Sequence, residues 1–205
     1  MEKAAFDLKG RVEAVLICPS FGSAASIEMP KIYAVVGHGI KGDKHAGVRE
    51  MDVREREMRL FGFREGHHVA NLREFSAVSA EELEAIGENL ALPAAIPFGC
   101  LTENLVIRGI PSLSQLPRGT LLFFRRDTQK VRTAVLSVWN ENGPCGGPGE
   151  ILQERFPDQP SLSSLFQKAA RGLRGVVGFV YVTGYIKPGD EVIAMIPHQR
   201  LYLPT

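Results

Sequence analysis

Residues 131–149 have the sequence VRTAVLSVWNENGPCGGPG, and this stretch decides the fold class. Its first part, Val131–Trp139, is rich in β-branched and apolar residues, a composition typical of a buried strand. Its last part, Asn142–Gly149, contains four glycines and two prolines, which interrupt regular structure. A short strand that ends in a tight Gly/Pro turn favours a β-rich fold over long helices.

Similar strand-like segments recur along the rest of the chain. They are Arg11–Cys18, Lys31–Val36, Asn71–Val78, Leu101–Ile107, Thr120–Arg125, Gly175–Val182, Tyr185–Lys187 and Val192–Ile196. Turn sequences separate several of them, including 117–119, 127–130 and 188–190. We predict a β meander across residues 101–139 and a hairpin-like unit at the end of the chain. This number of short strands predicts a barrel or a strongly bent sheet.

A few short helices are expected beside the strands. Ser79-Ala80-Glu81-Glu82 matches a capping box, which predicts a helix from there to about Gly87. Glu150–Phe156 and Ser161–Arg171 predict two more helices. The charged segment Arg49–Arg64 is interpreted as a surface helix or an excursion over the core. The prediction is one domain, residues 1–205, that is mainly β with a few short helices.

Composition restricts the classes of partner. Of the 205 residues, 44% are apolar and 23% are charged, which indicates a folded chain. The net charge of +1 predicts no general attraction to nucleic acid or to a membrane. The longest apolar runs are too short to cross a bilayer, and no signal-peptide pattern is present at Met1. We therefore expect a cytoplasmic protein that binds a small molecule locally.

The glycine-rich segment Gly37–Gly47 contains two histidines, two lysines and an aspartate. It includes G-x-G-x-x-G, the dinucleotide-binding pattern, but no helical pattern follows and the later strands lack βαβ spacing. We therefore reject a Rossmann site. The glycines would instead let backbone amides approach an anion, with charge added by Lys41 and Lys44. A plain glycine-rich hairpin loop is the alternative.

Histidine spacing gives little support for a metal cage. His38, His45, His67 and His68 match no helical ligand pattern, although Asp43 lies between the first two. The His67-His68 pair is typical of a solvated surface. We interpret His45 as a hydrogen-bonding or proton-transfer group.

Cys145 is the most informative of the three cysteines. No C-x-x-C pair occurs, so each cysteine is judged as a single thiol. Cys145 lies between Pro144 and Gly146, after a strand and just before a predicted helix whose free amides can stabilise a thiolate, although Glu150 would oppose this. These flanks suit a nucleophile, a persulfide carrier or a soft-metal ligand. An incidental loop thiol is the alternative. Cys18 is expected in the core, and Cys100 is ambiguous.

Taken in order, these motifs resemble the MOSC family, the domain named for the C-terminal part of molybdenum cofactor sulfurases. The matching fragments are Gly42-Asp43-x-His45-Ala46-Gly47, Glu103-Asn104-Leu105 with Gly109, Leu116-Pro117-x-Gly119, Pro144-Cys145, Gly175-Val176 and Lys187-Pro188-Gly189-Asp190. They cover about residues 12–195. The resemblance implies a MOSC-like β-barrel and a cysteine, Cys145, that carries sulfur or coordinates the molybdenum of a pterin cofactor.

The resemblance also implies roles for the surrounding residues. The implied catalytic residues are Cys145, His45 and Asp43, with Cys145 also the metal ligand. The implied cofactor-binding residues, for the molybdenum cofactor (molybdopterin), are Lys41, Gly42, Lys44, Gly47, Arg49, Glu103 and Asn104. Asp43, His45, Glu103 and Asn104 are expected to line one cavity, and Arg49 is a candidate partner for the pterin phosphate. The chain departs from the family pattern at Thr102, where a glycine often stands, at Gly146-Gly147 and in the charged segment 50–68.

Three functions remain open from the sequence. The first is a sulfur carrier or cofactor-binding protein, with a cysteine desulfurase as a possible partner; pyridoxal phosphate would belong to that partner. The second is a molybdenum-dependent reductase of N-hydroxylated compounds, which would need an electron-donor protein because the chain has no cysteine set for an iron–sulfur centre. The third is a non-catalytic anion-binding module. An enzyme would be a sulfur transferase or a molybdenum-dependent oxidoreductase.

Overall fold

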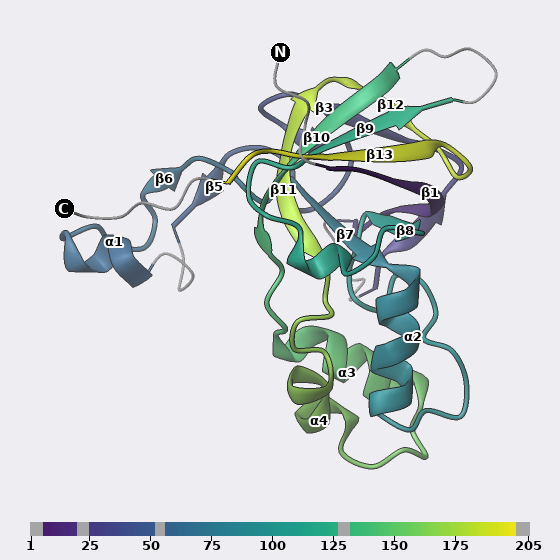
Figure 1. The fold of residues 1–205 in the computed structure, drawn as a ribbon. Helices are drawn as coiled ribbons and strands as arrows, with labels where there is room; N and C mark the ends of the chain where they lie inside the picture. The colour runs from purple at the N-terminus through teal and green to yellow at the C-terminus, as the bar shows by residue number, and fades with distance from the viewer. Residues whose placement is uncertain (1–5, 20–24, 52–55, 127–131, 200–205) are drawn as a thin grey trace.

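The computed structural model describes residues 6–19, 25–51, 56–126 and 132–199, and its elements are labelled in Figure 1. The strands are β1 (Phe6–Ile17), β2 (Ile27–Met29), β3 (Ile32–Val35), β4 (Gly39–Ile40), β5 (Arg49–Glu50), β6 (His68–Val69), β7 (Phe75–Ser79), β8 (Leu105–Arg108), β9 (Leu121–Arg125), β10 (Arg132–Glu141), β11 (Val176–Val182), β12 (Gly184–Ile186) and β13 (Glu191–Ile196). The helices are α1 (Arg56–Leu60), α2 (Ala80–Asn89), α3 (Gly146–Arg155) and α4 (Leu162–Ala169), with a 3₁₀ turn η1 at Leu113–Gln115.

Seven strands form a closed barrel. Their order is β13-β9-β10-β11-β7-β8-β1, and pairing of β13 with β1 closes the ring. Register shifts in β1 and β10 mark bulges, which bend long strands and help a sheet to close. β2 extends the sheet beside β1, and β12-β3-β4 form a smaller sheet. The predicted β-rich barrel with a few short helices is confirmed.

Two of the predicted strand pairings are wrong. The predicted meander holds only for β9 and β10, because β8 pairs with β1 and β7 instead of with β9. The predicted terminal hairpin is also wrong, since β12 pairs with β3 while β13 lies between β1 and β9. Sequence periodicity identifies a strand but not its partner, which barrel closure selects. The predicted turn at 127–130 lies outside the described residues.

β7 and β8 are the parallel pair of the barrel, and α2 connects them. A parallel pair needs a long crossover, which a helix supplies. The predicted helix start is confirmed, because Ser79 is the N-cap and its side chain accepts a hydrogen bond from Glu82 N. The Glu82 carboxylate accepts hydrogen bonds from Ser114 N and Oγ, so it anchors η1.

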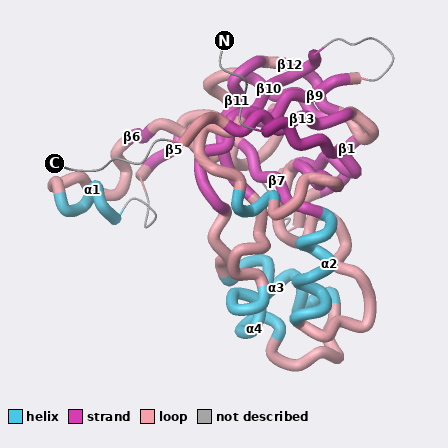
Figure 2. Tube along the Cα trace, viewed as in Figure 1, coloured by secondary structure: helices cyan, strands magenta, loops and turns pink. Residues whose placement is uncertain are grey.

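The molecule has one core inside the barrel and a second between the barrel and a helical layer of α2, α3 and α4 (Figures 1 and 2). On β1, Val15 faces the first core and Leu16 the second; on β8, Val106 faces the helices. Such alternation is the period of a strand. None of the helices in the described parts of the chain has the length and apolar composition needed to cross a membrane.

α3 begins at Gly146, earlier than the predicted Glu150. Its third residue is Pro148, which is compatible with a first turn because the amides there have no helical acceptor. Gly149 then allows close packing on α4, since a Cβ at this position would lie 2.9 Å from Ser163 O. The glycines that suggested a loop therefore form the start of a tightly packed helix.

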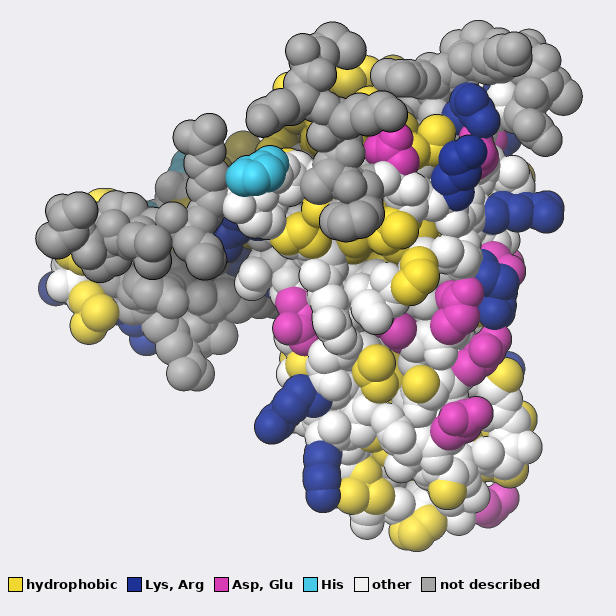
Figure 3. Space-filling model, viewed as in Figure 1, with side chains coloured by type: hydrophobic (Ala, Val, Ile, Leu, Met, Phe, Trp, Pro, Cys, Tyr) yellow, Lys and Arg dark blue, Asp and Glu magenta, His cyan; other side chains and the backbone are white. Residues whose placement is uncertain are grey.

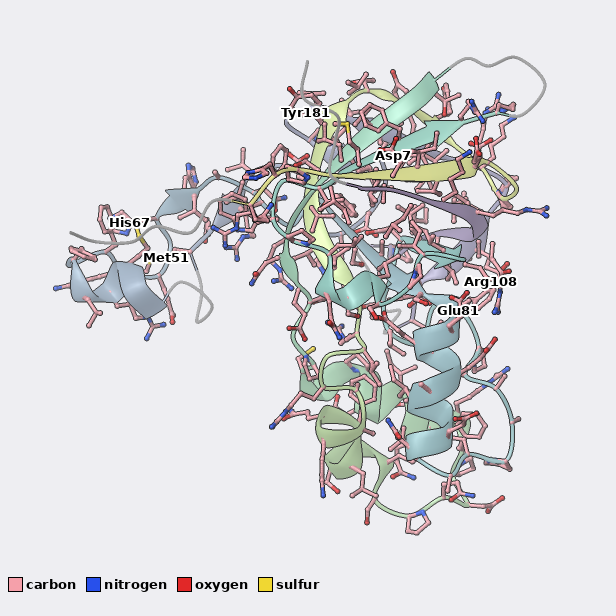
Figure 4. The ribbon with its side chains drawn as sticks, viewed as in Figure 1. Asp7, Met51, His67, Glu81, Arg108 and Tyr181 are labelled. Carbon is pink, nitrogen blue, oxygen red and sulfur yellow. The ribbon has the colours of Figure 1, made fainter. Side chains whose placement is uncertain are left out.

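β5, α1 and β6 form an arm that projects from the barrel (Figure 1). Figure 3 shows the helical layer as a projection below the barrel on the viewed face. The segment Arg49–Arg64 therefore starts as a strand and continues into a short helix, and residues 52–55 lie outside the described part. Met51 is buried within the arm, where its amide donates a hydrogen bond to His67 O, and Figure 4 shows the two residues close together.

Gly175 and Gly172 form a matched pair for testing how closely β11 must approach β7. Both have a positive φ, but a Cβ on Gly175 would lie 1.9 Å from Ala77 O, whereas a Cβ on Gly172 meets nothing within 4 Å. We predict that Gly172→Ala costs about 1–2 kcal/mol of unfolding free energy through its left-handed backbone, and that Gly175→Ala costs clearly more because β7 must shift. Urea denaturation measures both losses. Equal losses would contradict the close approach.

Candidate functional site

A cavity of about 740 Å³ lies where the barrel meets the helical layer and the base of the arm. Its walls come from segments far apart in sequence. The glycine-rich loop and the first residue of the arm contribute Lys44, His45, Ala46, Val48 and Arg49. The start of β7 and the residues before it contribute Asn71, Arg73, Phe75 and Ser76, and the residues before β8 contribute Thr102 and Asn104. The remaining wall comes from the loop before α3 (Asn142, Gly143, Pro144 and Cys145), from α3 (Gly147, Pro148, Glu150, Ile151 and Glu154) and from Arg174 and Val177.

Cys145 is an exposed free thiol in this cavity. It is the N-cap residue of α3, and its side chain makes no capping hydrogen bond to the helix. The positive end of the helix dipole lies beside the sulfur and favours negative charge there. The predicted accessible thiol is thus found in the same cavity as His45, which is what a functional cysteine requires.

Asp43 is a buried carboxylate that organises the glycine-rich loop. Its Oδ2 accepts hydrogen bonds from Cys18 N at 2.7 Å and from Asn104 Nδ2 at 2.7 Å, and its Oδ1 accepts one from His45 N at 2.8 Å. Burial alone would raise the pKa of Asp43, but the hydrogen bonds from His45 and Cys18 hold it below the ordinary value. Asp43 does not line the cavity, which corrects its expected position.

His45 connects that buried carboxylate to the cavity. Its Nδ1 lies 2.8 Å from Asp43 Oδ1, and because a carboxylate only accepts, Nδ1 carries the hydrogen of this bond. The second nitrogen, Nε2, is then the acceptor of the neutral ring. The side chain is 41% exposed and lines the cavity. An oriented imidazole in the same cavity as a thiol can accept and return a proton if the two groups meet.

Asn104 is the polar junction between the loop and the barrel. Its Nδ2 donates to Leu16 O as well as to Asp43, and its Oδ1 accepts from Ser76 N at 3.0 Å. It therefore links β1, the start of β7 and the glycine-rich loop through one side chain. Asn104 lines the cavity as expected.

Glu103 does not line the cavity, and this expectation is wrong. The side chain is fully buried, and its carboxylate accepts hydrogen bonds from the amides of Gly99 and Leu101. Burial raises the pKa of Glu103, and the two amides offset part of that increase. Thr102, which stands where a glycine often occurs, has φ +58°. This left-handed conformation explains the usual preference for glycine.

The remaining predicted cofactor-binding residues divide into two groups. Lys44 and Arg49 line the cavity, whereas Lys41, Gly42 and Gly47 do not. Gly42 and Gly47 have φ near +90°, so they shape the loop that presents its neighbours. The predicted contact of Lys41, Gly42 and Gly47 with an anion stays a prediction.

Arg73 and Arg174 are cavity residues that sequence reasoning missed. Arg73 Nη2 donates to Asn142 Oδ1 at 2.9 Å. Arg174 is 4% exposed, and its guanidinium donates to Leu101 O at 3.1 Å and Gly143 O at 3.3 Å. It thereby joins the Glu103 loop to the Cys145 loop. Its position just before Gly175, in a matched motif, was the available signal in the sequence.

The other thiols and histidines lie elsewhere. Cys18 is buried as predicted, and Cys100 is buried as well, where burial and then nearby Glu103 raise its pKa to about 11. Figure 4 shows His67 on the arm, away from the barrel, and His67 and His68 are exposed. Within the described residues, no three His, Cys, Asp or Glu side chains are grouped to hold a metal ion.

The fold and site define a barrel protein with one exposed thiol in a cavity rich in cationic side chains. Residues 64–193 match the family model of the MOSC domain. A protein of Bacillus subtilis (strain 168), named "Putative metal-sulfur cluster biosynthesis proteins YuaD", is 35% identical over 154 residues, which are 75% of this chain and 74% of that protein. The chain therefore belongs to the MOSC-domain family.

Solved structures agree with this assignment. The crystal structure of the YuaD protein from Bacillus subtilis has a TM-score of 0.81 and 32% identity, covering 92% of this chain and 97% of that chain. YiiM from Geobacillus stearothermophilus has a TM-score of 0.56 and 13% identity, covering 90% of this chain and 74% of that chain. The second similarity concerns the fold alone.

Asp43→Asn tests the buried hydrogen-bond network. We predict a loss of about 1–3 kcal/mol in unfolding free energy, because an amide nitrogen would face the donors that now meet a carboxylate. Since the folded pKa of Asp43 lies below its ordinary value of 3.8, its stabilisation is present above that value and is lost as pH falls through the folded pKa. Urea unfolding at a series of acidic pH values measures this.

The exposed Asp158 provides the control. Asp158→Asn should leave both the stability and its acid dependence close to those of the wild type. Asp43→Asn should weaken the acid dependence, so an unchanged pH profile in this variant would show that Asp43 does not carry the stabilisation.

Proposed function

We propose that this MOSC protein carries sulfur as a persulfide on Cys145 and that its cavity binds a phosphate-bearing pterin, the molybdenum cofactor. The observation that carries the proposal is the exposed Cys145 thiol at the start of α3, in one cavity with His45 and the cationic side chains. The name of the relative YuaD, which concerns metal-sulfur cluster biosynthesis, supports a role in sulfur handling.

The cavity residues fit such a cofactor. Lys44, Arg49, Arg73 and Arg174 all line the cavity, and guanidinium and ammonium groups suit the oxygens of a phosphate. The volume of about 740 Å³ is in the range of small-molecule and cofactor sites. When bound, the cofactor supplies molybdenum on a pterin dithiolene, and the Cys145 sulfur is the soft donor available to it.

The sulfur-loading step needs only thiol chemistry. His45 Nε2 accepts the proton of the Cys145 thiol, and the thiolate attacks the outer sulfur of a donor persulfide. The S–S bond of the donor breaks, a new S–S bond forms on Cys145, and the donor departs as a thiolate that takes back the proton. Sulfur is transferred without any external oxidant. Asp43 holds the ring in the tautomer that this step requires.

The donor would be another protein or a small persulfide. A cysteine desulfurase is the proposed protein donor, and pyridoxal phosphate would act within that partner. The described residues do not form a metal cage, so molybdenum would have to arrive with its pterin. A reductase of N-hydroxylated compounds would in addition need an electron-donor protein.

Mass spectrometry after exposure to a persulfide donor tests the carrier role. We predict that wild-type protein gains one sulfur atom on Cys145 and that Cys145→Ser gains none there. His45→Gln should slow the gain by about 10²-fold, the lower range for loss of a general base. Cys100→Ala, a buried control, should load normally. Sulfur on Cys18 or Cys100 with none on Cys145 would refute the proposal.

A comparison of two lysine variants tests whether the cavity binds the phosphate of the cofactor. Lys44 lines it and Lys41, on the same loop, does not. We predict that Lys44→Gln weakens binding of a pterin monophosphate about tenfold, the effect of losing one charge-assisted hydrogen bond, and that the loss shrinks at high salt. Lys41→Gln should bind as the wild type does. Calorimetry measures both affinities, and equal affinities would place the phosphate elsewhere.

A further inference from the structure

The cavity carries opposite charges on separate segments. Glu150 and Glu154 lie on α3, whereas Lys44 comes from the glycine-rich loop, Arg49 from β5 and Arg174 from the turn before β11. A phosphate accounts for the cations but gains nothing from two carboxylates in the same cavity. A ligand that carries charges of both signs would use both sides of the cavity.

The carboxylates belong to one face of α3. Gly147, Glu150, Ile151 and Glu154 line the cavity, and their spacing of i, i+3, i+4 and i+7 places them on a single stripe. The opposite side of the helix packs on α4, where Gly149 approaches Ser163 and Leu152 is fully buried. This packing fixes the rotation of α3, so the stripe that carries Glu150 and Glu154 lies along the cavity, where both residues are exposed.

Cys145 stands at the N-terminal end of this acidic stripe. It is the N-cap of α3, and the loop before it is held by the hydrogen bond from Arg174 to Gly143 O. The cavity that contains Cys145 is thus lined by carboxylates from α3 and by cations from other segments. Val48 and Ile151 add apolar surface for its carbon atoms.

We infer that the compound that exchanges sulfur with Cys145 is a small zwitterionic thiol derivative of the cysteine type. Its carboxylate is held by the cationic side chains Arg49 and Lys44, and its ammonium group by Glu150 and Glu154. The inference rests on the proposed function, since it names the class of small molecule that loads the same thiol. A free cysteine persulfide and a short peptide persulfide share this chemistry.

The step is a thiol–disulfide exchange and is balanced. The Cys145 thiolate attacks one sulfur of the compound, its S–S bond breaks, and a bond to Cys145 forms. With a persulfide attacked at its outer sulfur, Cys145 retains that sulfur and the cysteine-type thiolate leaves. With a symmetric disulfide, Cys145 becomes a mixed disulfide and one equivalent of thiolate is released.

Three symmetric disulfides of similar size differ in the charged groups that they carry, so they test the two kinds of contact independently. Cystine carries ammonium and carboxylate groups, cystamine only ammonium groups, and 3,3′-dithiodipropionate only carboxylates. Each rate of mixed-disulfide formation on Cys145 is divided by the rate of the same reagent with 2-mercaptoethanol, a neutral thiol, to remove intrinsic reactivity. We expect saturable kinetics with cystine and a normalised rate about tenfold above the other two, the effect of one added charged contact.

Variants show which charged side chains recognise the ammonium group and which recognise the carboxylate. Glu150→Gln with Glu154→Gln should remove the advantage of cystine over dithiodipropionate, and Arg49→Gln should remove its advantage over cystamine. Glu88→Gln, on the exposed surface of α2, is the matched control and should change nothing. Cysteine persulfide and glutathione persulfide as donors then distinguish a free amino acid from a short peptide by their loading rates.

Two results would overturn the inference. If the three disulfides react at equal normalised rates while Cys145 still gains sulfur from a persulfide, the carrier role stands and the zwitterion selectivity does not. If the glutamate variants alter only the binding of a pterin monophosphate, the carboxylates serve the pterin. Failure of Cys145 to accept sulfur from any donor would instead remove the proposed function itself.

Discussion

The site depends on one buried carboxylate, Asp43, that joins the glycine-rich loop to the barrel. Its oxygens accept hydrogen bonds from Cys18 at the end of β1, from Asn104 before β8 and from His45 within the loop. These bonds outweigh the desolvation that burial imposes, since the pKa of Asp43 lies below its ordinary value. The position of His45 and of the adjacent Lys44 therefore follows from a polar contact inside the protein.

A second set of buried contacts fixes the cysteine. Arg174 connects the Leu101 and Gly143 carbonyls, and α3 packs closely on α4 through Gly149. The Cys145 thiol therefore lies at the start of the packed helix α3, and the His45 imidazole lies on a loop held by hydrogen bonds to Asp43. Preorganisation of this kind holds reacting groups at a fixed separation. Both segments are connected to strands of the barrel, which hold them in position.

The sequence predicted the seven barrel strands, the α2 start and the accessible Cys145, because alternation, a capping residue and Gly/Pro flanks are local signals. It failed where geometry is non-local. The partners of β8 and β12 depend on barrel closure, and the inward direction of Glu103 depends on a turn whose amides need an acceptor. Arg73 reaches the cavity only because β7 lies beside β11. No pattern in the sequence indicates that β7 and β11 are neighbours.

We infer that the Cys145 thiol and the cationic side chains of the cavity form one site. To test this, the rate of Cys145 alkylation with iodoacetamide, a neutral reagent, is measured as a pterin monophosphate is titrated. We predict that alkylation slows in proportion to the fraction of protein with ligand bound. Ligand binding at full occupancy with an unchanged alkylation rate would contradict it, because the thiol and the anion would then occupy separate places.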